Sequence, residues 1–180
     1  MSESLPEFRY HPDPVATGSI VESEESCRCC GNQRGFIYTG PVYALGQGDR
    51  ELCPWCISDG SAAAMFDASF TDVALGFQDG VTVEVIEQVA KRTPGFIGWQ
   101  QAHWLFHCND AAAFLGLAGY AELPVHEDAI ESIRQECRDV GLPGDKIDDY
   151  VENLHVDGDA TAYLFKCLHC GRHLAYSDLS

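Results

Sequence analysis

The chain has 180 residues, of which 46% are hydrophobic and 22% are charged. These proportions are typical of a globular protein and exclude a disordered, collagen-like or coiled-coil chain. Lysine and arginine number 11 against 28 aspartates and glutamates, and the formal net charge of -17 argues against nucleic acid or an anionic lipid surface as a partner.

The first 25 residues are expected to form an extended arm docked on the domain, because they carry five apolar side chains: Phe8, Tyr10, Val15, Ile20 and Val21. His11 is expected to be tucked under this arm rather than to act as a base. The aromatic and β-branched run Gly35–Leu45 predicts a hairpin that turns at Gly40 and Pro41. A helix from about Ser58 to Phe66 should follow.

In the middle of the chain, an apolar face over Thr82–Arg92 predicts a helix with Thr82 as N-cap and Thr93–Gly95 as its end. The aromatic segment Trp99–Cys108 predicts a strand. Asp110 is then expected to cap a short alanine-rich helix over Ala111–Tyr120.

Two further helices are predicted over Glu127–Val140 and Asp145–Leu154. Thr161–Cys167 and His173–Tyr176 are predicted strands on either side of a tight turn. The order of the elements predicts an α+β fold with small antiparallel sheets or hairpins and several helices.

Residues Glu122–Asp159 carry twelve acidic side chains against only Arg134, Arg138 and Lys146. This pattern indicates a solvated helical face. The alternative is a surface that recruits a basic protein partner.

The nine cysteines include three Cys-x-x-Cys pairs. In a reducing compartment such pairs indicate metal ligation or redox chemistry rather than a disulfide framework. Two intervening residues let one tight turn aim both thiolates at a zinc ion, and a following glycine supplies the positive φ that the turn needs. The first two pairs predict a structural zinc site of four ligands: Cys27, Cys30, Cys53 and Cys56.

A turn, a hairpin, a second turn and a helix, in that order, resemble a treble-clef zinc module. The helix expected just after Cys56 would stabilise the thiolates through its dipole. Cys29 could replace Cys30 as a ligand, although the spacing and the glycine at position 31 favour Cys30.

The third pair has no partner pair, but a histidine and a cysteine end the strand that is expected from Trp99. If that strand pairs with the one before the last cysteine pair, a second zinc site forms from His107, Cys108, Cys167 and Cys170. Asp110 or His173 could supply the fourth ligand instead. Cys137 lies on the apolar face of a predicted helix and is assigned to the core.

Two zinc ions are therefore expected. Residues 1–70 are predicted to form an N-terminal zinc module with its docked arm, and residues 71–180 an α+β region with the second metal site, together one compact unit. The start of the chain lacks the pattern of a signal peptide. The weakly apolar stretch Ala111–Ala121 is too short to span a bilayer, so a cytoplasmic protein without membrane insertion is expected.

Several motifs in order resemble the CbrC family of bacterial proteins. They run from Phe8 to Tyr176: FRYHPDP, CRCCG, YTGPVYA, LCPWCISDGSAA, RTPGF, WQQ with WLFHCND, and YLFKCLHCG. The resemblance implies a label tied to colicin tolerance in enterobacteria, and it implies no particular reaction.

Closed four-ligand sites leave no position for a substrate, so the leading hypothesis is a zinc-stabilised binding or regulatory module with an unknown protein partner. One alternative is a thiol-disulfide oxidoreductase that uses Cys53 and Cys56, with Pro94 as a thioredoxin-like cis-proline. Another is a zinc-dependent hydrolase-type enzyme at the second site, where Asp110 or His103 would act on a metal-bound water.

Overall fold

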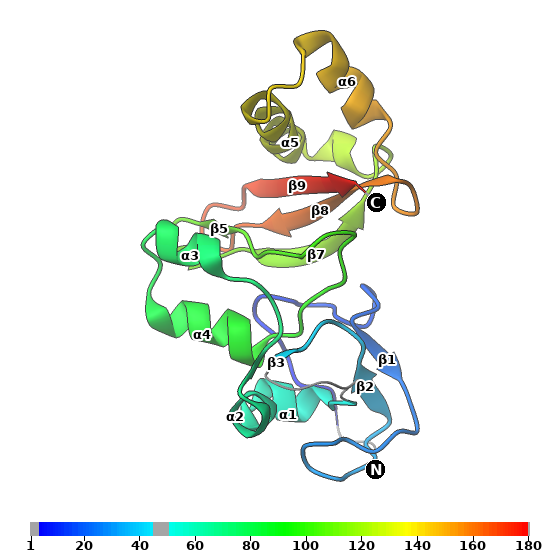
Figure 1. The fold of residues 1–180 in the computed structure, drawn as a ribbon, viewed down its shortest axis with the longest axis vertical. Helices are drawn as coiled ribbons and strands as arrows, with labels where there is room; N and C mark the ends of the chain where they lie inside the picture. The colour runs from blue at the N-terminus through cyan, green and yellow to red at the C-terminus, as the bar shows by residue number, and fades with distance from the viewer. Residues whose placement is uncertain (1–3, 45–50, 180) are drawn as a thin grey trace.

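The computed structural model of the chain describes residues 4–44 and 51–179. Figure 1 shows three parts stacked along the long axis: an N-terminal part at one end, a three-stranded sheet in the middle and a pair of helices at the other end. One cluster of buried apolar side chains lies within the N-terminal part, and one lies on each face of the sheet. The architecture is mixed α and β with small antiparallel sheets, as expected.

The N-terminal part combines two small antiparallel sheets with two short helices. The elements are β1 (Ile20–Glu22), which pairs with β2 (Phe36–Tyr38), β3 (Tyr43–Ala44), which pairs with β4 (Ala68–Ser69), α1 (Pro54–Ser58) and α2 (Ser61–Phe66).

The hairpin expected over Gly35–Leu45 is wrong for the described residues, and Leu45 itself lies outside them. β2 pairs with β1 and β3 pairs with β4, so Gly40 and Pro41 connect two sheets. The backbone groups of β2 find distant partners instead of local ones, as when Tyr38 N donates to Leu52 O at 2.8 Å.

The N-terminal arm docks through three buried side chains: Phe8, Tyr10 and Ile20. Val15 and Val21 are exposed, contrary to expectation. His11 is completely buried, with Nδ1 2.8 Å from Pro94 O and Nε2 2.7 Å from Thr17 Oγ1. Burial lowers the pKa of His11 to about 4. The ring is therefore neutral near pH 7 and fastens the arm to the chain around Pro94.

The central sheet has the order β7-β8-β9, with every pair antiparallel: β7 (Ala113–Ala118), β8 (Ala160–Lys166) and β9 (His173–Leu179). β8 is covered on both faces. Tyr163 and Phe165 belong to the apolar cluster on one face, and Ala162 and Leu164 to that on the other. Strands buried on both faces read as continuous apolar runs, which is why β8 is visible in the sequence.

The first face of the sheet is covered by the segment that contains α3 (Ala74–Gln78) and α4 (Val83–Arg92). α4 begins after Thr82 and ends before Thr93, as predicted. Phe96 occupies the middle of the cluster on this face and stacks on Phe114, with the ring centroids 3.9 Å apart.

The alanine-rich helix expected over Ala111–Tyr120 is wrong, because most of this segment is strand β7. From Phe114 to Ala118, buried and exposed residues alternate, which is the period of a strand. A register shift lies between Phe114 and Gly116, and the φ of Gly116 is 132°. Pairing with β8 thus outweighs the helix propensity of the alanines.

The strand expected over Trp99–Cys108 is also wrong for most of its length. Only β5 (Phe106–His107) forms, and it pairs with β6 (Asp110–Ala111) in a short hairpin. The earlier residues bond to side chains and loops, since Trp99 N donates to the hydroxyl of Tyr163 at 3.0 Å.

The second face of the sheet carries a short 3-10 turn and two helices: Leu123–Val125, α5 (Glu127–Asp139) and α6 (Gly144–Glu152). Both helices were predicted, and Cys137 is buried in the core as expected. α5 also protects the free edge of β9, because Asp128 accepts the backbone N–H of His173 at 2.6 Å and Glu136 that of Ser177 at 3.1 Å.

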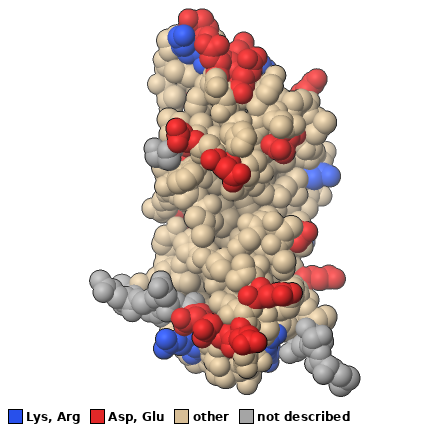
Figure 2. Space-filling view, turned by 90° about the vertical axis from the view of Figure 1, so that its right-hand side faces the viewer, with Lys and Arg blue, Asp and Glu red and all other residues tan. Residues whose placement is uncertain are grey.

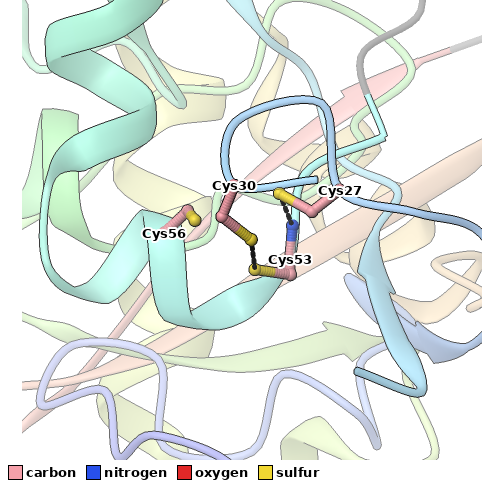
Figure 3. A group of neighbouring side chains, drawn as sticks. All are labelled: Cys27, Cys30, Cys53 and Cys56. Atoms are coloured by element: carbon pink, nitrogen blue, oxygen red, sulfur yellow. Dashed lines mark hydrogen bonds between the residues drawn. The ribbon is translucent and has the colours of Figure 1, made fainter. Parts of the chain in front are cut away.

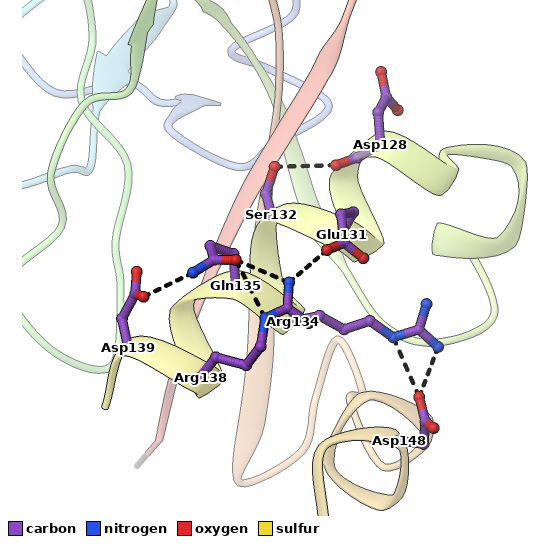
Figure 4. A network of polar contacts seen from close by, with 8 residues as sticks. All are labelled: Asp128, Glu131, Ser132, Arg134, Gln135, Arg138, Asp139 and Asp148. Carbon is purple, nitrogen blue, oxygen red and sulfur yellow. Dashed lines mark hydrogen bonds and ion pairs between the residues drawn. The ribbon is translucent and has the colours of Figure 1, made fainter. Parts of the chain in front are cut away.

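The outer side of α5 carries a network of charged side chains, shown in Figure 4. Arg138 pairs with Glu131 along the helix, and Arg134 reaches Asp148 of α6 at 2.7 Å. These groups are largely exposed, which fits the solvated helical face predicted for this acidic stretch. Within the described residues, no helix is both long enough and apolar enough to cross a membrane.

Candidate metal centres

Two groups of side chains each bring four possible ligand atoms to within 4.8 Å of one another. They are Cys27, Cys30, Cys53 and Cys56, and His107, Cys108, Cys167 and Cys170. Figure 3 shows the first group, with two cysteines from one loop and two from the start of α1. The structure therefore brings together both sets that the sequence predicts, and each set could hold a metal ion.

The same tight turn carries the paired cysteines at both centres. In the first, Gly31 N donates to Cys27 O at 2.7 Å, and in the second, Gly171 N donates to Cys167 O at 3.1 Å. Both glycines have positive φ, 72° and 76°, a conformation that glycine adopts without steric cost. Each turn aims two side chains to the same side, as the Cys-x-x-Cys-Gly pattern predicts.

The second half of the first centre comes from the start of α1. Cys53 is the extended N-cap residue, Pro54 occupies the first turn and Cys56 lies in that turn. Proline suits this place because its missing N–H would have no helical partner there. A helix therefore begins inside the CPWC motif. The single helix expected from about Ser58 to Phe66 is instead two short helices, α1 and α2, separated by Asp59 and Gly60.

One sulfur–sulfur distance at the first centre is compatible with a tetrahedral metal ion such as zinc. Cys30 Sγ lies 3.9 Å from Cys53 Sγ, whereas Zn–S bonds of about 2.3 Å put two sulfurs of a tetrahedron about 3.8 Å apart. Cys27, Cys53 and Cys56 are buried, and Cys30 is exposed.

The electrostatics of the first centre favour a bound cation. Burial disfavours the charged thiolate of Cys27, but three backbone N–H groups donate to its sulfur and lower its pKa to about 7. Burial raises the pKa of Cys53 to about 11 and that of Cys56 further still. A divalent ion would offset the repulsion among these neighbouring thiolates and let all of them ionise.

Cys29 lies outside the first group. Its sulfur is 3.5 Å from Ser61 Oγ, while its backbone N–H donates to Cys27 Sγ at 3.4 Å. The geometry brings Cys30, and not Cys29, to the other three sulfurs.

At the second centre, a two-residue turn presents adjacent ligands. His107 pairs with Asp110 across the β5–β6 hairpin, so Cys108 and Asn109 form its turn. Both have positive φ, 55° and 58°, as in a type I′ hairpin turn. This turn is the bend that lets His107 and Cys108 face one point, although neighbouring residues in a straight strand face opposite sides.

The four side chains of the second centre are close together, and two of them, Cys108 and Cys170, are exposed. His107 Nδ1 lies 3.2 Å from Cys108 Sγ and 3.5 Å from Cys170 Sγ. Only Cys167 is buried. Although burial opposes its charge, hydrogen bonds from backbone N–H groups and from His107 lower the pKa of Cys167 to about 6. Desolvation and the other two sulfurs raise the pKa of Cys108 to about 11.

Asp110, weighed as a ligand or a catalytic base, is held by other partners. Its carboxylate accepts hydrogen bonds from Tyr10 at 2.7 Å and Arg9 at 2.8 Å, and it lies 2.9 Å from Nε2 of His169. Burial opposes its ionisation, but the bonds from Tyr10 and His169 hold the pKa of Asp110 below its ordinary value. This contact was not predicted, because its only signal in the sequence is the histidine inside the CLHCG turn.

The other candidates also lie away from the two groups. His173 contacts Asp128 and stacks near His126, with the ring centroids 4.0 Å apart. His103 stacks on Tyr176 at 3.8 Å. All nine cysteines are free thiols. The peptide bond before Pro94 is trans, so the cis-proline that the oxidoreductase alternative expected is absent.

Comparison with known proteins places the chain in a family. The model of UPF0167, described as an uncharacterised protein family, matches residues 5–179. The chain belongs to the UPF0167 family. UPF0167 proteins of Mycobacterium bovis and Mycobacterium tuberculosis are each 53% identical to it over 178 residues, which cover 99% of this chain and 95% of each relative.

A UPF0167 protein of Pseudomonas aeruginosa is 43% identical over 180 residues, covering 99% of this chain and 98% of the relative. No solved structure matches the chain. The assignment to the CbrC family was wrong, because the matching family model and these relatives all carry the UPF0167 name. Nothing in these matches supports the link to colicin tolerance.

Proposed function

We propose that this UPF0167 protein is a zinc protein with two structural four-ligand sites, one of four cysteines and one of a histidine and three cysteines. One observation carries the proposal: at each centre a Cys-x-x-Cys turn meets two further side chains from a distant part of the sequence, so that four possible ligand atoms come together. Thiolate and imidazole are the ligands that zinc prefers in structural sites, and four of them complete a tetrahedron.

The proposed first site resembles a treble clef. A Cys-x-x-Cys-Gly turn supplies one pair of ligands and the start of α1 supplies the other. The strands between the two pairs of ligands do not pair with each other, because β2 pairs with β1 and β3 pairs with β4. The resemblance to a treble clef therefore rests on the turn and the helix. The surrounding cluster of buried residues contains three of the cysteines themselves, which suggests that this part depends on its metal for stability.

A non-catalytic role fits the geometry better than either enzymatic alternative. Four protein ligands leave no open position for a metal-bound water, and Asp110 is occupied by three other side chains. For a thiol-disulfide enzyme the attacking thiol needs a lowered pKa, whereas burial raises that of Cys53.

The proposal therefore includes a binding or regulatory role with a protein partner of basic surface. The net charge of -17 supports such a partner and disfavours nucleic acid. A reducing compartment such as the cytoplasm suits nine free thiols.

Cobalt substitution tests the proposal. Protein refolded with Co²⁺ in place of zinc should give thiolate-to-cobalt charge-transfer bands and the visible bands of a tetrahedral ion, titrating to two ions per chain. The double variant Cys27→Ser/Cys30→Ser should retain only the spectrum of a site with one nitrogen and three sulfur ligands. A spectrum of octahedral cobalt, or no binding, would refute the proposal.

A further inference from the structure

A cavity of about 380 Å³ opens between the N-terminal arm, the loop after α4 and the central sheet. Phe96, Phe114 and Tyr163 form its inner wall. Around its mouth stand Trp99 and Leu117, whose side chains are 55% and 41% exposed. Ile97 of the lining is exposed as well, and several apolar side chains exposed together at a concave site mark a place of binding.

The polar groups of the lining are largely satisfied within the protein. Tyr163 donates to Asp178 at 2.8 Å and accepts the N–H of Trp99, while the indole N–H of Trp99 points to Thr161 Oγ1 at 3.3 Å. These bonds, together with the stacking of Phe96 on Phe114, hold the walls in place. The cavity is therefore preformed, and it offers an incoming group mainly apolar surface, to which Trp99 adds an exposed aromatic ring.

Among the described residues that line the cavity, one is charged: Asp157, which is exposed at the rim. The segments that line the cavity lie towards the right-hand side of Figure 1. Figure 2 faces that side and shows a broad uncharged band across the middle of the molecule, with charged side chains, more of them acidic than basic, above and below it.

We infer that this cavity is the docking site for a large aromatic side chain, carried by a protein segment with lysine or arginine on both sides of it. The apolar lining, with Trp99 and Leu117 at its mouth, matches the ring, and the acidic groups around the uncharged band match the flanking cations. The volume lies at the small end of the range for ligand pockets, about 300–1,000 Å³, so it suits one side chain better than an extended cofactor. The inference names the partner class for the binding role proposed above and rests on that role.

Two capped peptides provide the test, Lys-Lys-Trp-Lys-Lys and Lys-Lys-Ala-Lys-Lys, titrated into the full-length protein by calorimetry. The tryptophan peptide should bind at least tenfold more tightly than the alanine peptide. Moderate salt should weaken the binding of both peptides but preserve the ratio of their affinities, because salt screens the charges of the lysines and does not screen the burial of the tryptophan ring.

Two variants of β7 locate the binding site. Leu117→Arg places a cation at the mouth of the cavity and should weaken the tryptophan peptide at least tenfold. Leu115→Arg is the matched control, since Leu115 is exposed on the same strand but does not line the cavity. The affinity of this variant for the tryptophan peptide should stay within about twofold of the wild-type value, because substitutions of exposed residues usually have small effects.

Zinc content is measured on the same samples. Equal affinity for the two peptides, no binding of either, or equal effects of the two arginine variants would each overturn the inference. Because any of these results can occur in protein that carries its full zinc, they would leave the zinc proposal standing.

Discussion

Nε2 of His169 lies 2.9 Å from Oδ2 of Asp110, and this contact joins the two halves of the second centre. Asp110 follows the hairpin turn that carries Cys108, and His169 lies between the two cysteines of the last turn. The same carboxylate binds Tyr10 of the N-terminal arm. A single buried carboxylate thus links three segments that are distant in the sequence.

Replacing Asp110 by alanine should lower the free energy of unfolding by about 1–3 kcal/mol, because the partly buried hydroxyl of Tyr10 loses its acceptor. Urea denaturation measures the change. Asp148→Ala is the control: its pair with Arg134 is exposed, and such pairs contribute about 1 kcal/mol or less. Equal losses in the two variants would refute the linking role of Asp110.

The two centres should lose their metal independently. Cys53→Ser/Cys56→Ser should remove one zinc ion and unfold the N-terminal part, whereas Cys167→Ser/Cys170→Ser should remove the other and leave that part folded. Cys29→Ser is the matched control and should retain both ions, since Cys29 lies outside both groups. Elemental analysis and limited proteolysis give the readouts, and a loss of zinc in Cys29→Ser would show that the first ligand set is misassigned.

A chelator should remove the two ions at different rates. Three of the four ligands of the first centre are buried, but only Cys167 is buried in the second, so the second ion is more accessible. Release to a colorimetric chelator should have a fast and a slow phase of equal size. The fast phase should vanish in Cys167→Ser/Cys170→Ser. Its persistence in that variant would mean that the first centre is the labile one.

His11 should make the stability depend on pH. Burial lowers its pKa from 6.5 to about 4 in the folded protein, so the unfolded chain binds a proton that the folded protein does not take up between these values. The stability contributed by neutral His11 is therefore complete above about pH 6.5 and is lost as the pH falls towards 4, at up to about 1.4 kcal/mol per pH unit.

Comparison with His11→Gln separates this effect from acid release of metal, which both proteins share. Urea denaturation at several pH values should show a shallower slope for the variant between pH 4 and 6.5. Parallel slopes would contradict a neutral, buried His11.

The sequence predicted which side chains come together at each centre, because the Cys-x-x-Cys-Gly pattern is local: each such run forms its own turn around Gly31 or Gly171. It also predicted α4, α5 and α6 from the period of their apolar residues, and β8 and β9 from the apolar run that ends at Cys167 and the turn that follows it. It failed where distant partners decide the structure. The alanines before Phe114 favour a helix by propensity, but pairing with β8 makes a strand of the segment that follows.

The turn at the second centre is a further feature that the local sequence did not predict. A shared site for His107 and Cys108 requires a bend in the expected strand, but the sequence did not specify the two-residue turn in which Cys108 and Asn109 adopt positive φ. The position of Asp110 depends on Tyr10 and His169, about 100 and 59 residues away along the chain. No local pattern reports such contacts.

The zinc content of the purified protein tests the central claim most directly. Protein prepared without chelator and analysed for metals together with its concentration should contain two zinc ions per chain. Protein that contains no zinc, and that stays folded and takes up none when zinc is added under reducing conditions, would contradict the claim that these eight side chains form two structural zinc sites.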